Sequence, residues 1–137
     1  MVGMEFKWLY SNKSPAILHR KIALIKLFLQ HKMKKDTTIL LQKIKQAVKT
    51  VEPDADIILY GSYARGQQRD DSDIDLLILV NEENLSYGYR KKVTYPLYKI
   101  ELDTRIHISP FLYNKKKWEM YQVTPFYQTV KEEGIFL

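Results

Sequence analysis

Two aspartates, Asp73 and Asp75, stand at the start of an apolar run with the composition of a buried strand. Side chains alternate between the two faces of a strand, so these carboxylates share one face, while Ile74 and Leu76 point to the other. Neighbouring carboxylates repel each other, and a divalent cation between them removes that cost. Carboxylate oxygens suit Mg²⁺ or Mn²⁺, which also accept waters and phosphate oxygens as ligands. The pair therefore predicts a metal site suited to phosphoryl or nucleotidyl transfer.

A glycine-serine turn precedes this pair in the sequence and supplies a second feature. Gly61 lacks a Cβ, so its backbone can approach a phosphate closely, and Ser62 adds a hydroxyl donor. Successive backbone N–H groups in such a turn form an anion-binding concavity. Arg65 either adds positive charge to the loop or ties it to the Asp70–Asp71 turn. We therefore predict a phosphate-binding loop next to a metal-binding pair.

Each half of this pattern has a purely structural interpretation when it is taken alone. Gly61-Ser62 is then an ordinary turn, and the two aspartates line an exposed strand edge. Together they favour a functional site, because Asp75 directly precedes Leu-Leu-Ile-Leu-Val, where an uncompensated charge would be costly. Two other phosphate-binding motifs, Gly-x-x-x-x-Gly-Lys-Ser/Thr and Gly-x-Gly-x-x-Gly, do not occur in the chain.

The elements that position these residues follow the order helix, strand, strand, helix, strand, helix, which predicts one small α/β domain. Apolar residues at helical spacing, ended by Pro53, predict the first helix of this domain. In chain order we expect a helix from Asp36 or Thr37 to Val51, strands at Asp56–Tyr60 and Ser72–Val80, a helix at Tyr89–Asp103, a strand at Arg105–Tyr113, a short helix after Asn114 that carries Trp118, and a helix from Thr124-Pro125 to Gly134.

The first 32 residues differ from the rest in charge. They contain six Lys/Arg against one Asp/Glu, whereas residues 33–137 contain 16 against 15. A helix capped by Ser14 is expected to precede a break at His31–Lys35, and the Met33-Lys-Lys segment resembles a new start. We expect residues 1–32 to be an extension that the core does not require, and residues 33–137 to be the domain. The near-neutral domain argues against direct nucleic-acid binding.

Composition indicates a protein of the cytoplasm without a membrane-spanning segment. The chain has no cysteine, which excludes disulfides and thiolate metal sites and fits a reducing compartment. The apolar stretch of residues 16–29 is interrupted by charged residues, and it is too short to cross a bilayer.

The segment GSYARGQQRDDSDIDLLI resembles the signature of the polymerase-β-type nucleotidyltransferase superfamily. Its Ala-Arg-Gly and Ser-Asp-Ile-Asp-Leu are similar to those of minimal nucleotidyltransferases, the type paired with HEPN-domain proteins. The resemblance implies a mixed sheet of about three or more strands flanked by helices (α+β). It implies that Gly61 and Ser62 hold the triphosphate of ATP or another NTP, that Asp73 and Asp75 bind Mg²⁺, and that Ser72 and Arg65 support nucleotide binding.

One departure from the family concerns catalysis. Active members carry a third carboxylate on the strand after the next helix, whereas here that segment reads Arg105-Ile-His-Ile-Ser109. His107 is the nearest match by position, either as a base or as part of a solvated strand face. Glu101 and Asp103 are expected to end the preceding helix.

Two functions follow from the resemblance. The first is metal-dependent transfer of AMP to a hydroxyl of a protein acceptor, a HEPN-type toxin that this protein neutralises as an antitoxin. The alternative is a catalytically weak or inactive module that binds nucleotide or partner and acts by occlusion.

Overall fold

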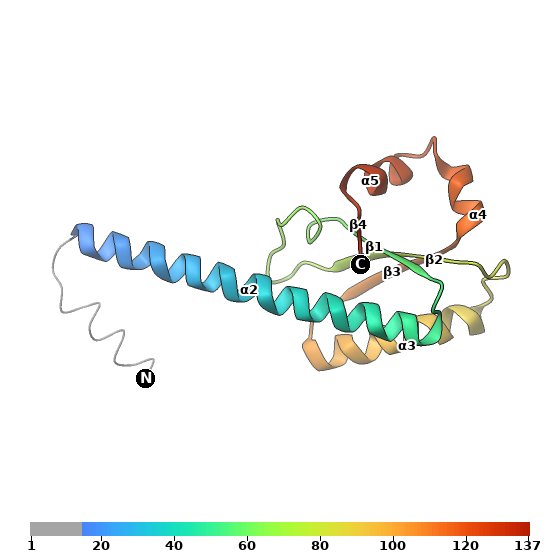
Figure 1. Cartoon of the computed structure of the whole chain (residues 1–137), viewed down its shortest axis with the longest axis horizontal. Coiled ribbons are helices and arrows are strands. Elements are labelled where there is room, and N and C mark those ends of the chain that lie inside the picture. Colours follow the sequence, from blue (N-terminus) through green and yellow to red (C-terminus); the bar gives the residue numbers. More distant parts are fainter. Residues whose placement is uncertain (1–14) are drawn as a thin grey trace. The chain divides into compact units, whose positions relative to one another are not determined.

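The computed structural model describes residues 15–137, apart from the side chains of Pro15 and residues 29–33 (Figure 1). The chain divides into two compact units, Met1–Leu40 and Leu41–Leu137. The second unit holds a four-stranded sheet flanked by helices, which confirms the predicted fold class. The domain boundary expected at residue 33 stays a prediction. Within the described residues, no helix has the length and apolar character needed to cross a membrane.

A single helix, α2, runs from Pro15 to Val51. The break predicted at His31–Lys35 and the new helix start predicted at Asp36 or Thr37 are therefore wrong. Inside α2 there is no glycine and no further proline, so no residue of the segment has a backbone that interrupts helical hydrogen bonding. Charged residues changed the hydrophobic pattern there without ending the helix. The predicted cap Ser14 lies outside the described residues.

The last turns of α2 belong to the second unit and are amphipathic. Ile44 and Val48 are fully buried, whereas Lys43 and Lys45 are exposed, as their helical spacing predicts. Of the same predicted face, Ile39 is exposed. The helix ends two residues before Pro53, as predicted.

The sheet has the strand order β3-β2-β1-β4 and is mixed, because β2 pairs with β3 in parallel and the other pairs are antiparallel. Three differences from the prediction concern its strands. β2 begins at Ile74, two residues later than expected, so Asp73 precedes the strand. β3 begins three residues later than expected, because Arg105 adopts a left-handed conformation with φ of 59° and caps the preceding helix. The two-residue strand β4 was not predicted. The strands are β1 (Asp56–Tyr60), β2 (Ile74–Val80), β3 (Ile108–Asn114) and β4 (Ile135–Phe136).

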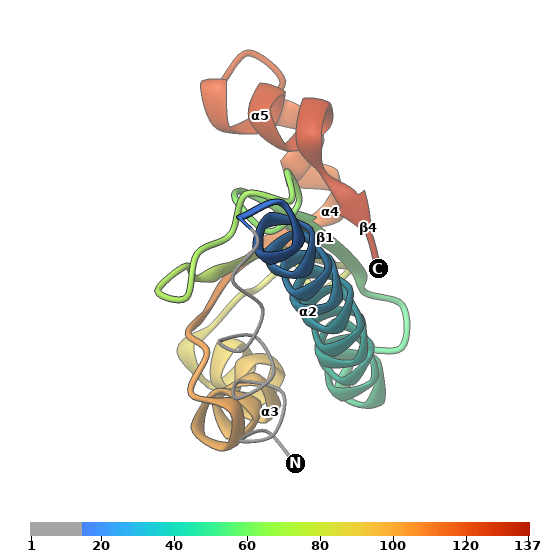
Figure 2. The same ribbon diagram turned by 90° about the vertical axis from the view of Figure 1, so that its left-hand side faces the viewer.

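The remaining helices are α3 (Tyr87–Thr104), α4 (Lys115–Trp118) with the 3₁₀ turn η1 (Glu119–Tyr121), and α5 (Pro125–Glu133). α3 and the last turns of α2 lie on one side of the sheet, and α4 and α5 lie on the other (Figures 1 and 2). Side-chain caps set the helix starts: Asn114 accepts the Lys117 N–H at 3.0 Å, and Thr124 accepts the Tyr127 N–H at 3.2 Å. The predicted starts of both C-terminal helices are thereby confirmed.

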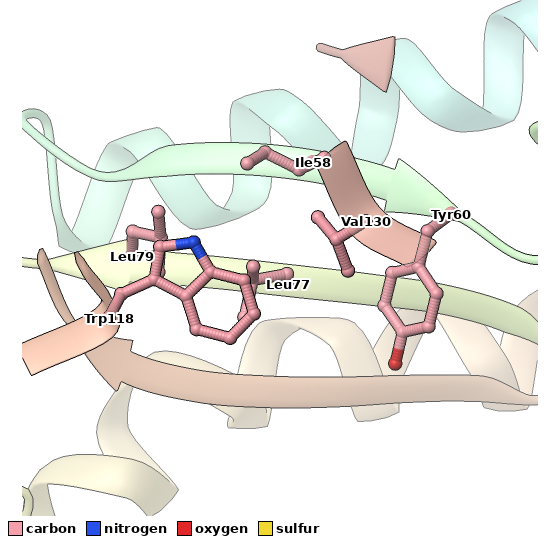
Figure 3. Close-up of a cluster of buried hydrophobic side chains, with 6 residues drawn as sticks. All are labelled: Ile58, Tyr60, Leu77, Leu79, Trp118 and Val130. Atoms are coloured by element: carbon pink, nitrogen blue, oxygen red, sulfur yellow. The ribbon is translucent and has the colours of Figure 1, made fainter. Parts of the chain in front are cut away.

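A buried cluster joins α4 and α5 to the central strands (Figure 3). Trp118 is 5% exposed and packs with the half-buried Phe126 and Tyr127, whereas Tyr121 and Phe136 are 42% and 70% exposed. This packing fixes α5 over the face of the sheet that also carries Asp75, since Asp75 shares that face with Leu77 and Leu79. The cluster consists of Ile58, Tyr60, Leu77, Leu79, Trp118 and Val130.

Candidate active site

The glycine-serine turn directly follows β1 and is shaped by its own backbone. Gly61 has φ of +75° and Gly66 has φ of +65°, in the left-handed region that favours glycine. The Arg65 N–H donates to the Gly61 carbonyl at 3.1 Å, and the Gln67 N–H donates to the Ser62 carbonyl at 2.9 Å. Backbone hydrogen bonds therefore fix the geometry of this turn at the end of β1, where the sequence predicted a turn.

Asp75 lies beside this turn because of the strand register. It pairs with Tyr60, the last residue of β1, and so reaches the level of Gly61. A Cβ added to Gly61 would overlap the Asp75 carboxylate oxygen Oδ2 and lie 3.2 Å from Cγ. Gly61 is thus required twice, by its positive φ and by the close approach of the carboxylate. The structure brings the turn and Asp75 together, as predicted.

Asp73 is exposed and precedes β2, and Asp75 is the second residue of that strand and half-buried. Burial raises the pKa of Asp75 above its usual value, the charge of Asp73 raises it further, and the Arg65 guanidinium lowers it. Two carboxylates whose charges interact in this way suit a divalent cation that also binds phosphate oxygens. The donor set therefore fits Mg²⁺ or Mn²⁺ held between the protein and a triphosphate.

A tyrosine adjoins the aspartates on the same face of the sheet. Burial, the charge of Asp75 and the Tyr113 hydroxyl, in that order of importance, together raise the pKa of Tyr60 to about 12. The Tyr60 hydroxyl therefore keeps its proton at neutral pH and can serve only as a neutral donor or acceptor.

Ser72 and His107 take different positions from those of the turn and the aspartates. The Ser72 hydroxyl accepts the Arg69 N–H at 2.8 Å and so closes the turn that leads into β2. His107 is exposed and precedes β3, and its carbonyl accepts the Ile74 N–H at 2.9 Å. This bond directly precedes the parallel register of β2 and β3, which begins at Ile74 and Ile108 and pairs Ser109 with Asp75. Their roles in nucleotide binding and catalysis stay predictions.

No third carboxylate completes the aspartate pair on β3. Ser109 occupies the position opposite Asp75, and the Glu101 carboxylate accepts the Ile108 N–H at 3.2 Å, which holds it at the start of β3. Glu101 and Asp103 belong to α3, as predicted. Among residues 15–137, no group of three or more acidic, histidine or cysteine side chains is arranged to hold a metal. A metal at Asp73 and Asp75 would therefore depend on the substrate for most of its remaining ligands.

Glu133, the last residue of α5, is a site residue that the sequence did not indicate. Its Oε1 accepts the Gly61 N–H at 2.9 Å, and its Oε2 accepts from Arg65 Nη1 at 2.7 Å. The Arg65 hydrogen bond lowers the pKa of Glu133, and the Gly61 N–H acts in the same direction. Its position at a helix C-terminus was one available signal in the sequence. The negative end of the helix dipole repels a carboxylate there, so the carboxylate needs a positively charged or donating partner.

Arg65 therefore forms an ion pair with Glu133. One of its two predicted roles was to tie the loop to the Asp70–Asp71 turn, and Glu133 is its partner instead. Its side chain is 45% exposed and that of Glu133 is 17% exposed. The pair crosses from the loop after β1 to the end of α5, and no local pattern in the sequence links these two segments.

Residues 41–137 match the family model described as "Nucleotidyltransferase domain". The chain belongs to this family. The match covers the turn, both aspartates and Glu133, and it confirms the resemblance to polymerase-β-type nucleotidyltransferases.

Two known proteins show further similarity. A Methanocaldococcus jannaschii protein named "putative protein adenylyltransferase" is 35% identical over 78 residues, which are 56% of this chain and 78% of that protein. A chain of a crystal structure titled as a toxin–antitoxin with AMP-PNP has 22% sequence identity and a TM-score of 0.48, over 69% of each chain.

Proposed function

We propose that this nucleotidyltransferase transfers AMP from ATP to a hydroxyl of a protein acceptor. The observation that supports this most is the placement of Asp75 beside the Gly61 turn, with the charge of Asp73 acting on it, in a chain of this family. The similar archaeal protein, named as a putative protein adenylyltransferase, supports a protein acceptor. By the resemblance to minimal nucleotidyltransferases, the acceptor is a HEPN-type toxin that the transfer neutralises.

In the proposed reaction, the acceptor hydroxyl oxygen attacks the α-phosphorus of ATP. The new O–P bond forms as the bond from that phosphorus to the oxygen bridging to the β-phosphate breaks, and pyrophosphate leaves. Gly61, Ser62 and Arg65 would bind the β- and γ-phosphates, and Asp73 and Asp75 would hold Mg²⁺. The cation, when bound, neutralises charge on the phosphates and on the leaving group. The hydroxyl proton passes to His107 or to water.

A second candidate function is a binding module with little or no transferase activity. The specific observation in its favour is that Ser109 stands opposite Asp75, where the family's third carboxylate is absent. Such a protein would bind nucleotide or partner and act by occlusion alone.

Incubation with labelled ATP and Mg²⁺, with and without the product of the adjacent gene, separates the two functions. Label transferred to the partner, with a mass increase of one AMP and release of pyrophosphate, supports the transferase. A stable complex with unmodified partner, at enzyme concentrations equal to those of the partner, supports occlusion.

A further inference from the structure

The donors that would bind phosphate are already occupied by a carboxylate of the chain itself. The Gly61 N–H and the Arg65 guanidinium converge on Glu133, and each carboxylate oxygen accepts from one of them, at 2.9 and 2.7 Å. A charged donor and a backbone N–H acting on one anion is also the arrangement by which proteins bind phosphate. Glu133 therefore sits where a phosphate oxygen of the substrate would sit.

The position of Glu133 is fixed by the elements on either side of it. α5 is held over the sheet by Val130, which belongs to the buried cluster (Figure 3). The next residue, Gly134, fits tightly, since a Cβ there would meet the Val130 carbonyl and lie 2.8 Å from Ile58 Cγ2. Ile135 then pairs with Leu59. The backbone thus delivers the carboxylate to the turn, and only the Glu133 side chain needs to rotate for it to leave.

The turn does not depend on Glu133 for its shape. Three backbone hydrogen bonds lie within it: Arg65 N–H to the Gly61 carbonyl, Gly66 N–H to the Tyr63 carbonyl, and Gln67 N–H to the Ser62 carbonyl. The carboxylate of Asp75 also packs directly against Gly61. These contacts therefore argue against Glu133 being the sole support of the loop.

A bound triphosphate and the Glu133 carboxylate cannot use the same donors together. Both are anions, and Asp73 and Asp75 already make this end of the sheet negative. We propose that Glu133 is an internal competitor of the triphosphate, which occupies the Gly61 N–H and Arg65 in the free protein and is displaced when nucleotide binds. This inference rests on the proposed function, which assigns these two groups to the triphosphate.

If Glu133 competes with the triphosphate, removal of its charge should raise the affinity for nucleotide. Removing the charge of Glu133, as Gln does, leaves one oxygen that can accept, so at least one donor is freed, the remaining contact is weakened and a repulsion is removed; nucleotide binding therefore becomes tighter. A support for the loop would give the opposite result, because losing a support weakens binding. Loss of the charge-assisted contact between Glu133 and these donors should tighten nucleotide binding about tenfold.

The test measures binding of Mg²⁺ with a non-hydrolysable ATP analogue, and separately of Mg²⁺ with tripolyphosphate, by titration calorimetry. The variants are Glu133→Gln, which keeps the side-chain size, and Glu133→Asp, which keeps the charge but is one methylene shorter. Glu132→Gln is the matched control, since Glu132 is the exposed neighbour on the same helix. Thermal unfolding of each protein confirms that it is folded.

Tighter binding of both probes by Glu133→Gln, a smaller gain for Glu133→Asp and no change for Glu132→Gln are the expected results. Equal or weaker binding by folded Glu133→Gln, while the wild type binds, overturns the competitor and leaves the proposed function intact. Binding by Glu133→Gln but not by the wild type supports a stronger form of the same competition. If neither protein binds either probe, both the competitor and the proposed function are wrong.

Discussion

Gly61 and Gly66 differ in one respect that makes them a matched pair for substitution by alanine. Both have positive φ, but a Cβ on Gly66 would have no atom within 4 Å, whereas one on Gly61 would overlap the carboxylate of Asp75. Gly66→Ala therefore tests the backbone conformation alone. Gly61→Ala tests that conformation together with the close approach of Asp75.

The expected magnitudes follow from these two contributions. A left-handed conformation costs a residue with a Cβ about 1–2 kcal/mol, so Gly66→Ala should lower the free energy of unfolding by about 1 kcal/mol. Overpacking typically adds about 1–3 kcal/mol, so Gly61→Ala should lower it by about 3 kcal/mol. In a domain of this size each kcal/mol corresponds to a fall in Tm of about 3–6 °C.

A double-mutant cycle isolates the steric contribution. Asp75→Ala removes Oδ2 and Cγ and leaves the Asp75 Cβ 3.4 Å from the added methyl group, an ordinary contact. Gly61→Ala should therefore cost about 2 kcal/mol less in the Asp75→Ala background than in the wild type. Urea unfolding followed by circular dichroism measures all four free energies, and unchanged m-values show that the comparison is sound.

Equal costs for Gly61→Ala and Gly66→Ala, with no coupling to Asp75, would refute the close approach. Nucleotide binding offers an independent reading of the same contact. Folded Gly61→Ala should lose Mg²⁺-dependent nucleotide binding, because the methyl group displaces the Asp75 carboxylate, and Gly66→Ala should retain it.

Three further predictions concern the metal, the N-terminal segment and the partner. Asp73→Asn should weaken Mg²⁺-dependent nucleotide binding in calorimetry and abolish any transfer, whereas Asp71→Asn, which alters an exposed aspartate outside the pair, should do neither; equal binding by both contradicts the metal assignment. A chain that begins at Met33 should have a Tm within a few degrees of that of the full chain, because the large apolar side chains described between residues 17 and 28 are 40–67% exposed. A fall in Tm of many degrees would show that these side chains contribute to the core. The protein should co-elute in gel filtration with the product of the neighbouring gene, with Tyr121 and Phe136 among the exposed rings available to it, and separate elution at micromolar concentration would contradict the complex.

Local patterns in the sequence determined most of the elements and half of the site. Alternation and β-branched residues predicted β1 and β2, and the caps at Asn114 and Thr124 predicted α4 and α5. The Gly61 turn and the two aspartates could be predicted because they occur together in the sequence, a glycine that suits a turn followed by carboxylates two residues apart at the start of an apolar run. The error at His31–Lys35 arose because a change in side-chain pattern does not alter the backbone's ability to continue a helix.

Tertiary structure alone decided which residues meet across the sheet. The strand register set Asp75 against Gly61 and put Ser109, not a carboxylate, on its other side. The packing of Trp118 and Val130 fixed α5 over the same face, and the pairing of β4 with β1 then brought Glu133 to the Gly61 N–H and Arg65. The contacts of Glu133 with Gly61 and Arg65 join segments about 70 residues apart. Hydrophobic periodicity does not predict such contacts, because it reports only which face of an element is buried. The sequence therefore predicted groups suited to binding phosphate and metal, and the fold decided that the Glu133 carboxylate accepts hydrogen bonds from two of them, the Gly61 N–H and Arg65.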